Sequence, residues 1–113
     1  MDNNFQFDHE IEWQTADVMV DRQIFGYSDQ VMMVKVKFAT GGIGDVHQHP
    51  HTQVTYVESG VFEMTIGTET KIIRKGDGFF VPPDVPHGVV CIEAGMLVDC
   101  FTPMRRDFYD HCS

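Results

Sequence analysis

The stretch GGIGDVHQHPHTQVTYVESG at residues 41–60 and the stretch GDGFFVPPDVPH at residues 76–87 contain most of the chemistry visible in this sequence. Three of their imidazoles and one of their amides stand at spacings that let them converge. Such a donor set is typical of a soft to borderline divalent metal ion. The sequence therefore predicts one metal site assembled from both stretches, with these ligands: His47, His49, Gln53 and His87.

The spacing of the four residues indicates how their side chains converge. Residues two apart in a strand share a face, so His47 and His49 are expected to point the same way. Gln53 has the same parity, and the intervening Pro50 suggests a bend rather than an unbroken strand. Local structure cannot bring His87 to the other three residues, so it must arrive from a neighbouring strand.

Short segments with strand character follow one another along the chain, separated by glycine and proline. Apolar and polar side chains alternate from residue 31 to residue 38, which indicates a strand with one buried and one solvated face. The whole pattern is typical of an all-β sandwich or barrel, and it predicts a small antiparallel β-barrel. Strands are expected at residues 31–38, 53–58, 62–66, 70–74, 79–81, 87–93 and 96–102, with a helical turn within residues 105–112.

The chain is long enough for one domain only. Its 113 residues, of which 42% are hydrophobic and 12% aromatic, are typical of a globular protein with a single core. Residues 1–30 are predicted to form an N-terminal arm, with a short strand through Val18, Val20 and Ile24, and residues 31–113 the barrel domain. An arm of this kind covers a sheet edge or contacts a partner subunit. We therefore expect a homodimer.

Charge and cysteine content narrow the class of protein. Lys and Arg total 8 against 17 Asp and Glu, and the net charge of −9 disfavours nucleic acid and anionic membranes as partners. An anionic substrate would need local attraction, from a metal or a single arginine.

We find no signal peptide and no stretch near the roughly 20 apolar residues of a membrane span. The three cysteines, Cys91, Cys100 and Cys112, have no CxxC spacing, which predicts free thiols in a reducing cytoplasm.

Both stretches resemble the two motifs of the cupin superfamily, single-domain cupin_2 type. Gly41-x5-His47-x-His49-x3-Gln53-x6-Gly60 is similar to the first motif, which ordinarily has Glu where Gln53 stands. Gly76-x5-Pro82-x-Asp84-x2-His87-x3-Cys91 is similar to the second, with Asp84 and Cys91 in place of the usual Gly and Asn. The resemblance implies an RmlC-like jelly-roll barrel of two packed antiparallel sheets, with the metal inside it.

A glutamine among these ligands has a chemical consequence. A neutral amide in place of a carboxylate leaves the bound ion about one charge more positive, and so a stronger electrophile toward anionic oxygen donors. Dioxygen-activating iron sites more often keep a carboxylate, so Gln53 favours other chemistry. The metal itself is not determined, because nickel, zinc, manganese and iron all tolerate three histidines and a glutamine.

A narrower resemblance lies near the C-terminus, where Asp99-x-Phe101-x3-Arg105 is similar to the catalytic Asp, Phe and Arg of pectin-degradation (KdgF-like) cupins. These proteins convert 4,5-unsaturated monouronates from pectin or alginate into linear ketonised sugars. Asp99 and Phe101 share parity with the inward-facing residues of their strand, and a buried acid should have a raised pKa or a partner. Asp99 could then move a proton from the anomeric hydroxyl to C4, Arg105 could bind the substrate carboxylate, and Phe101 could form an apolar wall.

Less specific interpretations stay open for the same residues. Asp99 could be a satisfied core acid, Arg105 beside Arg106 and Asp107 could be a solvated helix start, and Phe101 could be core packing. The whole chain could also be a cupin that binds a small molecule or sugar without turnover. A metal-dependent cupin dioxygenase or isomerase is a further alternative.

Overall fold

A computed structural model describes residues 4–108 of the chain, and almost all of its regular structure is β-strand. A short 3-10 helix, η1, precedes the first strand, and a helical turn occupies residues 106–108. No helix within the described residues is long and apolar enough to cross a membrane. The elements are η1 (Asp8–Glu10), β1 (Gln14–Asp17), β2 (Val20–Tyr27), β3 (Met32–Phe38), β4 (Ile43–His47), β5 (Thr52–Ile66), β6 (Glu69–Arg74), β7 (Gly78–Val81) and β8 (His87–Thr102).

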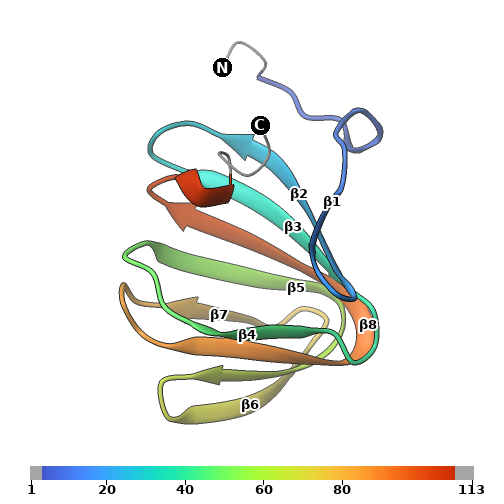
Figure 1. Ribbon diagram of the computed structural model, residues 1–113, viewed down its shortest axis with the longest axis vertical. Helices are drawn as coiled ribbons and strands as arrows, with labels where there is room; N and C mark the ends of the chain where they lie inside the picture. Colours follow the sequence, from blue (N-terminus) through green and yellow to red (C-terminus); the bar gives the residue numbers. More distant parts are fainter. Residues whose placement is uncertain (1–3, 109–113) are drawn as a thin grey trace.

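Two long strands, β5 and β8, organise the sheet. They pair with one another along almost their whole length, and both bend. Residues 95–101 of β8 pair with β3, whereas residues 87–90 pair with β4, so the two halves of β8 lie in opposite layers. Figure 1 shows the turn of β8 at one end of the molecule, with its two halves running back above and below. One antiparallel sheet thus folds over on itself, and the predicted barrel is confirmed.

The predicted strand breaks at Ser59-Gly60 and Ala94-Gly95 are wrong. Each is a bend within a continuous strand, and the register shifts between Val57 and Phe62 mark the place. Gly60 has φ +86°, and a Cβ there would lie 2.7 Å from the carbonyl oxygen of Glu93. A Cβ at Gly95 would overlap the backbone of Ser59. Glycine is therefore required for close approach of two bent strands, not for a turn.

The N-terminal region has more structure than the single short strand that the sequence predicts. β1 pairs with β2, and β2 continues the sheet from β3. The side chain of Gln23 is fully buried and donates hydrogen bonds to the carbonyl oxygens of Asp8 (3.1 Å) and Ile11 (2.9 Å). These bonds tie η1 to the face of β2 that points away from the barrel interior. The division into an arm and a barrel domain stays a prediction.

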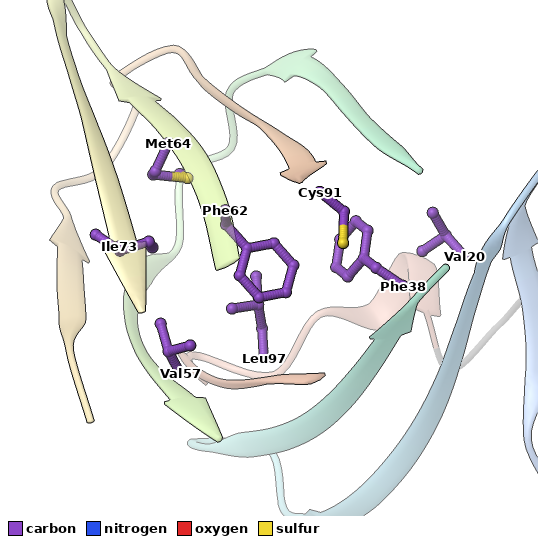
Figure 2. Close-up of a cluster of buried hydrophobic side chains, with 8 residues drawn as sticks. All are labelled: Val20, Phe38, Val57, Phe62, Met64, Ile73, Cys91 and Leu97. Atoms are coloured by element: carbon purple, nitrogen blue, oxygen red, sulfur yellow. The ribbon is translucent and has the colours of Figure 1, made fainter. Parts of the chain in front are cut away.

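The barrel interior holds two groups of apolar side chains. The larger group lies near the bends of β5 and β8, and Figure 2 shows its side chains pointing toward one another. The smaller one comes from β3, β8 and the segment after it. The larger group is Val20, Phe38, Val57, Phe62, Met64, Ile73, Cys91 and Leu97, and the smaller one is Met32, Val34, Phe101 and Met104.

Candidate metal centre and adjoining cavity

Three histidines converge from two neighbouring segments. His47 is the last residue of β4 and lies opposite His87, the first residue of β8. His49 lies outside the strands, in the connection before β5. This connection bends at Pro50, as the sequence predicts. One ring nitrogen from each of the three lies within 4.8 Å of the others. His49 and His87 are buried, whereas His47 is exposed at the rim.

The second ring nitrogen of each histidine fixes its protonation. Nδ1 of His47 lies 2.8 Å from the carbonyl oxygen of Asp45, and Nδ1 of His87 lies 2.9 Å from that of Val85. Nδ1 of His49 lies 3.1 Å from the carbonyl oxygen of His51. A carbonyl only accepts, so the network assigns the proton to Nδ1 and leaves the Nε2 lone pair available. This is the form in which histidine binds a metal.

His87 gives the clearest sign that a cation fits this site. Its Nε2 is buried and has no hydrogen-bond partner among the described residues. Burial, more than any other effect, lowers the pKa of His87 to about 4, so the ring is neutral at pH 7. An acceptor nitrogen without a donor is costly in a protein interior. A bound metal ion would satisfy it.

Gln53 completes a donor set of three nitrogens and one oxygen. Its amide Nε2 donates to Oγ1 of Thr55 at 3.0 Å and lies 3.4 Å from Oδ1 of Asp99, which turns Oε1 toward His49. Oε1 and Nε2 of His49 are 3.0 Å apart. With the proton of His49 on Nδ1, two acceptors face one another, an arrangement that a cation between them would resolve. The four side chains therefore fit a divalent transition metal.

Asp99 lies directly beside this donor set. Its Oδ1 accepts a 2.6 Å hydrogen bond from Oγ1 of Thr55 and the longer one from Gln53. Burial raises the pKa of Asp99 to about 6, against the opposing effect of the Thr55 hydrogen bond. The bonds from described side chains both end on Oδ1, so Oδ2 is the oxygen on which a proton can come and go. Asp99 was expected to face inward and to have a raised pKa or a partner, and in the structure it is buried and has both.

A cavity of about 310 Å³ inside the barrel adjoins the candidate metal centre. Apolar side chains from both core groups form most of its wall. The polar groups are few, as is common in binding sites for small molecules. All three residues of the C-terminal motif contribute to the lining, which includes His47, His87, Gln53, Asp99, Phe101 and Arg105.

Arg105 is buried in the wall of the cavity. Its side chain is 9% exposed, so the interpretation as a solvated helix start is wrong. Asp107 binds one edge of the guanidinium with two short contacts, Nε to Oδ1 at 2.9 Å and Nη2 to Oδ2 at 2.6 Å. Cζ of Arg105 lies 4.1 Å from the ring centre of Phe108 and 5.2 Å from that of Phe101. The bidentate partner in this structure is thus Asp107.

The structure adds residues that sequence reasoning missed. Thr55 has the same parity as Gln53 and Val57 on β5, so its inward position was predictable from the alternation. Arg22 lies between the inward-facing Val20 and Ile24 of β2, and its Cζ is 4.1 Å from the ring centre of Phe108. Arg22 and Phe108 both line the cavity. The sequence offered one signal for Arg22: it is a charged residue at a position where the alternation of β2 calls for an apolar side chain.

Comparisons with known proteins agree with this geometry. The sequence profile of the cupin domain family (Cupin_2) matches residues 34–99, which is more than half of the chain. The pectin degradation protein KdgF of Dickeya dadantii (strain 3937) is 42% identical over 103 residues, covering 89% of this chain and 94% of that protein.

Two solved structures are similar along most of their length. An RmlC-like cupin from Shewanella frigidimarina NCIMB 400 is 40% identical with a TM-score of 0.92, covering 94% of this chain and 96% of that one. KdgF from a Halomonas species is 35% identical with a TM-score of 0.90, covering 94% of this chain and 98% of that one. The jelly-roll barrel implied by the sequence motifs is the fold of these structures.

Proposed function

This chain belongs to the cupin domain family and is similar to KdgF within it, and from that premise we propose that it is a metal-dependent enzyme. Its substrates would be 4,5-unsaturated monouronates released from pectin or alginate, and its products the linear ketonised uronates. The observation that carries the proposal is a buried carboxyl group, Asp99, with a pKa that burial raises to about 6, in the cavity that joins the histidines to Arg105.

The reaction needs one group that first takes a proton and then returns it. Asp99 accepts the proton of the anomeric hydroxyl, C1 becomes a carbonyl, and the C1–O5 bond breaks with its electron pair on O5. The resulting enolate at C4, C5 and O5 then takes the proton from Asp99 at C4, and C5 becomes a ketone. Substrate and product are isomers, so no oxidant or second reactant is required. A pKa of about 6 lets one carboxyl group do both steps near neutral pH.

The remaining groups position the substrate. Arg105 would bind its carboxylate through the guanidinium edge that Asp107 does not occupy, and Phe101 would form the apolar wall beside the ring. A divalent ion held by the four ligands would polarise the substrate oxygens and stabilise negative charge on them. The proposed ligands are His47, His49, Gln53 and His87, and nickel, zinc, manganese and iron all suit them.

We also propose that the protein is a cytoplasmic homodimer. Large apolar side chains are exposed on the outer face of β5 and β7, where Val54 lies opposite Phe80 and Tyr56 follows on the same face. An apolar patch of this kind is a common contact surface between the two copies of a dimer. Analytical ultracentrifugation that gives only monomer at micromolar concentration would reject the dimer.

The cysteines bear on the compartment. Cys91 and Cys100 are free thiols, as expected in a reducing compartment, and Cys112 lies outside the described residues.

The activity is tested with unsaturated monogalacturonate and the metal-loaded protein. We expect the ultraviolet absorbance of the 4,5 double bond to disappear much faster than without protein. Asp99→Asn should abolish this acceleration while the metal content, measured by elemental analysis, stays the same. Unaccelerated loss of absorbance with the wild-type protein would overturn the proposal. Tight binding of the uronate by a wild-type protein that does not convert it would indicate a binding protein instead.

A further inference from the structure

We propose that Asp107 is a positioning residue, which holds one edge of the Arg105 guanidinium so that the opposite edge faces the cavity. The inference rests on the proposed function, because it assigns Arg105 to the substrate carboxylate. It gives Asp107 a role that the resemblance to other cupins does not include.

The geometry of the ion pair supports this role. Asp107 uses both carboxylate oxygens, and its two contacts engage Nε and Nη2, which lie on the same edge of the guanidinium. Of the five N–H donors of arginine, the three that remain are on Nη1 and on the far side of Nη2. Those three define a second edge, which can accept a carboxylate in the same two-point manner.

The surroundings of the pair restrict the guanidinium further. The ring of Phe108 lies 4.1 Å from Cζ of Arg105, and Phe101 contributes a second aromatic contact at 5.2 Å. The side chain of Arg105 is 9% exposed, whereas that of Asp107 is 50% exposed. Asp107 therefore contacts Arg105 from the solvent side, and Arg105 itself reaches the cavity that it lines. A guanidinium held on one edge and one face has little freedom to rotate.

Two effects of removing the Asp107 carboxylate have opposite signs, and this makes the inference testable. If Asp107 merely competed with the substrate for Arg105, its loss would release a full positive charge and lower KM. If Asp107 positions Arg105, its loss lets the guanidinium rotate away from the binding geometry, and KM rises. The direction of the change in KM therefore separates the two cases.

The experiment compares Asp107→Asn, Asp107→Glu and Asp29→Asn in the metal-loaded protein. We expect Asp107→Asn to raise KM for unsaturated monogalacturonate about tenfold while kcat changes less than about twofold. Asp107→Glu keeps the carboxylate and should recover most of the loss. Asp29→Asn is the matched control, because Asp29 pairs with the adjacent, exposed Arg106 at 3.8 Å and does not contact Arg105. An unchanged or lowered KM in Asp107→Asn would overturn the inference.

A second measurement is independent of turnover. The Nε–H proton of Arg105, assigned by its loss in Arg105→Lys, should exchange slowly with solvent in the wild-type protein and at least about tenfold faster in Asp107→Asn. Equal exchange rates would also overturn the inference. If the wild-type protein shows this protection but does not convert the uronate, the proposed function fails while the positioning of Arg105 stands.

Discussion

Gln53 has contacts that explain why an amide stands where the first cupin motif ordinarily has a carboxylate. Its Nε2 donates to Thr55 and approaches Oδ1 of Asp99, while its Oε1 faces His49. A glutamate here could donate to neither neighbour and would bring a second negative charge beside Asp99. The sequence shows the substitution and its effect on metal charge. The contact with Asp99 becomes visible only once β5 and β8 are paired.

We predict that Gln53→Glu retains metal but shifts the pH dependence of activity. The new carboxylate should raise the pKa of Asp99 beyond the value of about 6 that burial already gives it, because like charges disfavour ionisation. The ring-opening step needs the ionised form, so kcat/KM rises with pH and its acidic midpoint should move to higher pH. The measurement is kcat/KM across the pH range, with metal content as the control. An unmoved midpoint would contradict the assignment of Asp99 as the base.

Asp99 should also leave a signature in the stability of the metal-free protein. Burial raises its pKa from the usual 3.8 to about 6 in the folded state, so between these values the folded state binds more protons than the unfolded state. Stability is therefore lost as pH rises through this window. Relative to Asp99→Asn, the wild-type protein should lose about 2 kcal/mol of unfolding free energy between about pH 4 and pH 8.

Urea denaturation in the presence of a chelator measures this difference at each pH. Burial lowers the pKa of His87 to about 4, which adds stability as pH rises and so acts in the opposite direction. That contribution is present in both proteins, and the comparison with Asp99→Asn isolates the carboxyl group. If the difference in unfolding free energy between the wild-type protein and Asp99→Asn does not change with pH, Asp99 is ionised in the folded state at little cost.

At the scale of elements, the glycines in the bends of β5 and β8 decide whether one sheet can form both layers. Gly60→Ala should destabilise the protein by about 1–3 kcal/mol or more, because a Cβ there is disfavoured at φ +86° and also meets the backbone of β8. Gly76→Ala is the matched control. Gly76 has φ +93° with nothing within 4 Å of the added Cβ, so it reports the backbone strain alone.

Thermal and urea unfolding of the two variants test this. Gly60→Ala should lower the free energy of unfolding more than Gly76→Ala does. Equal losses would show that the close approach of the two bent strands contributes little to stability.

The sequence predicted elements well where one face of a strand is buried and the other is solvated. β3 shows this alternation, with Met32 and Val34 buried and Met33 exposed. The signal is lost on β2, because Gln23 is buried under the N-terminal segment on one face while Val20 is buried in the barrel on the other. Glycine at a bend and glycine at a turn give the same local pattern, so the continuity of β5 and β8 could not be predicted.

The candidate site was predictable to a similar extent. Parity placed Asp99 and Phe101 inward, and motif spacing brought the histidines together. The Arg105–Asp107 pair was not foreseen, since residues two apart do not face one another on a helix. In the structure Arg105 precedes the helical turn, and its side chain folds back against Asp107.

For the molecule as a whole, net charge and local charge act in opposite directions on an anionic substrate. The protein carries a net charge of −9, whereas Arg22 and Arg105 both line the cavity. Salt screens the exposed surface charges more than it screens groups inside a cavity. We therefore predict that kcat/KM for unsaturated monogalacturonate rises when ionic strength increases from roughly 10 mM to roughly 150 mM.

The reversal of one exposed charge provides a control for this effect. Glu63→Lys, on the outer face of β5, should reduce the salt dependence without changing the site. A kcat/KM that falls with salt would show that the arginines, and not the whole-protein field, govern the approach of the substrate.

We propose that Asp99 delivers a proton to C4 of the substrate from one wall of the cavity, and product analysis in D2O tests this. The linear product, examined by NMR, should carry one deuteron at C4 in a single stereochemical position, because the carboxyl group reaches only one face of the bound enolate. The same product with deuterium distributed equally between both positions, or an unchanged substrate, would contradict the claim.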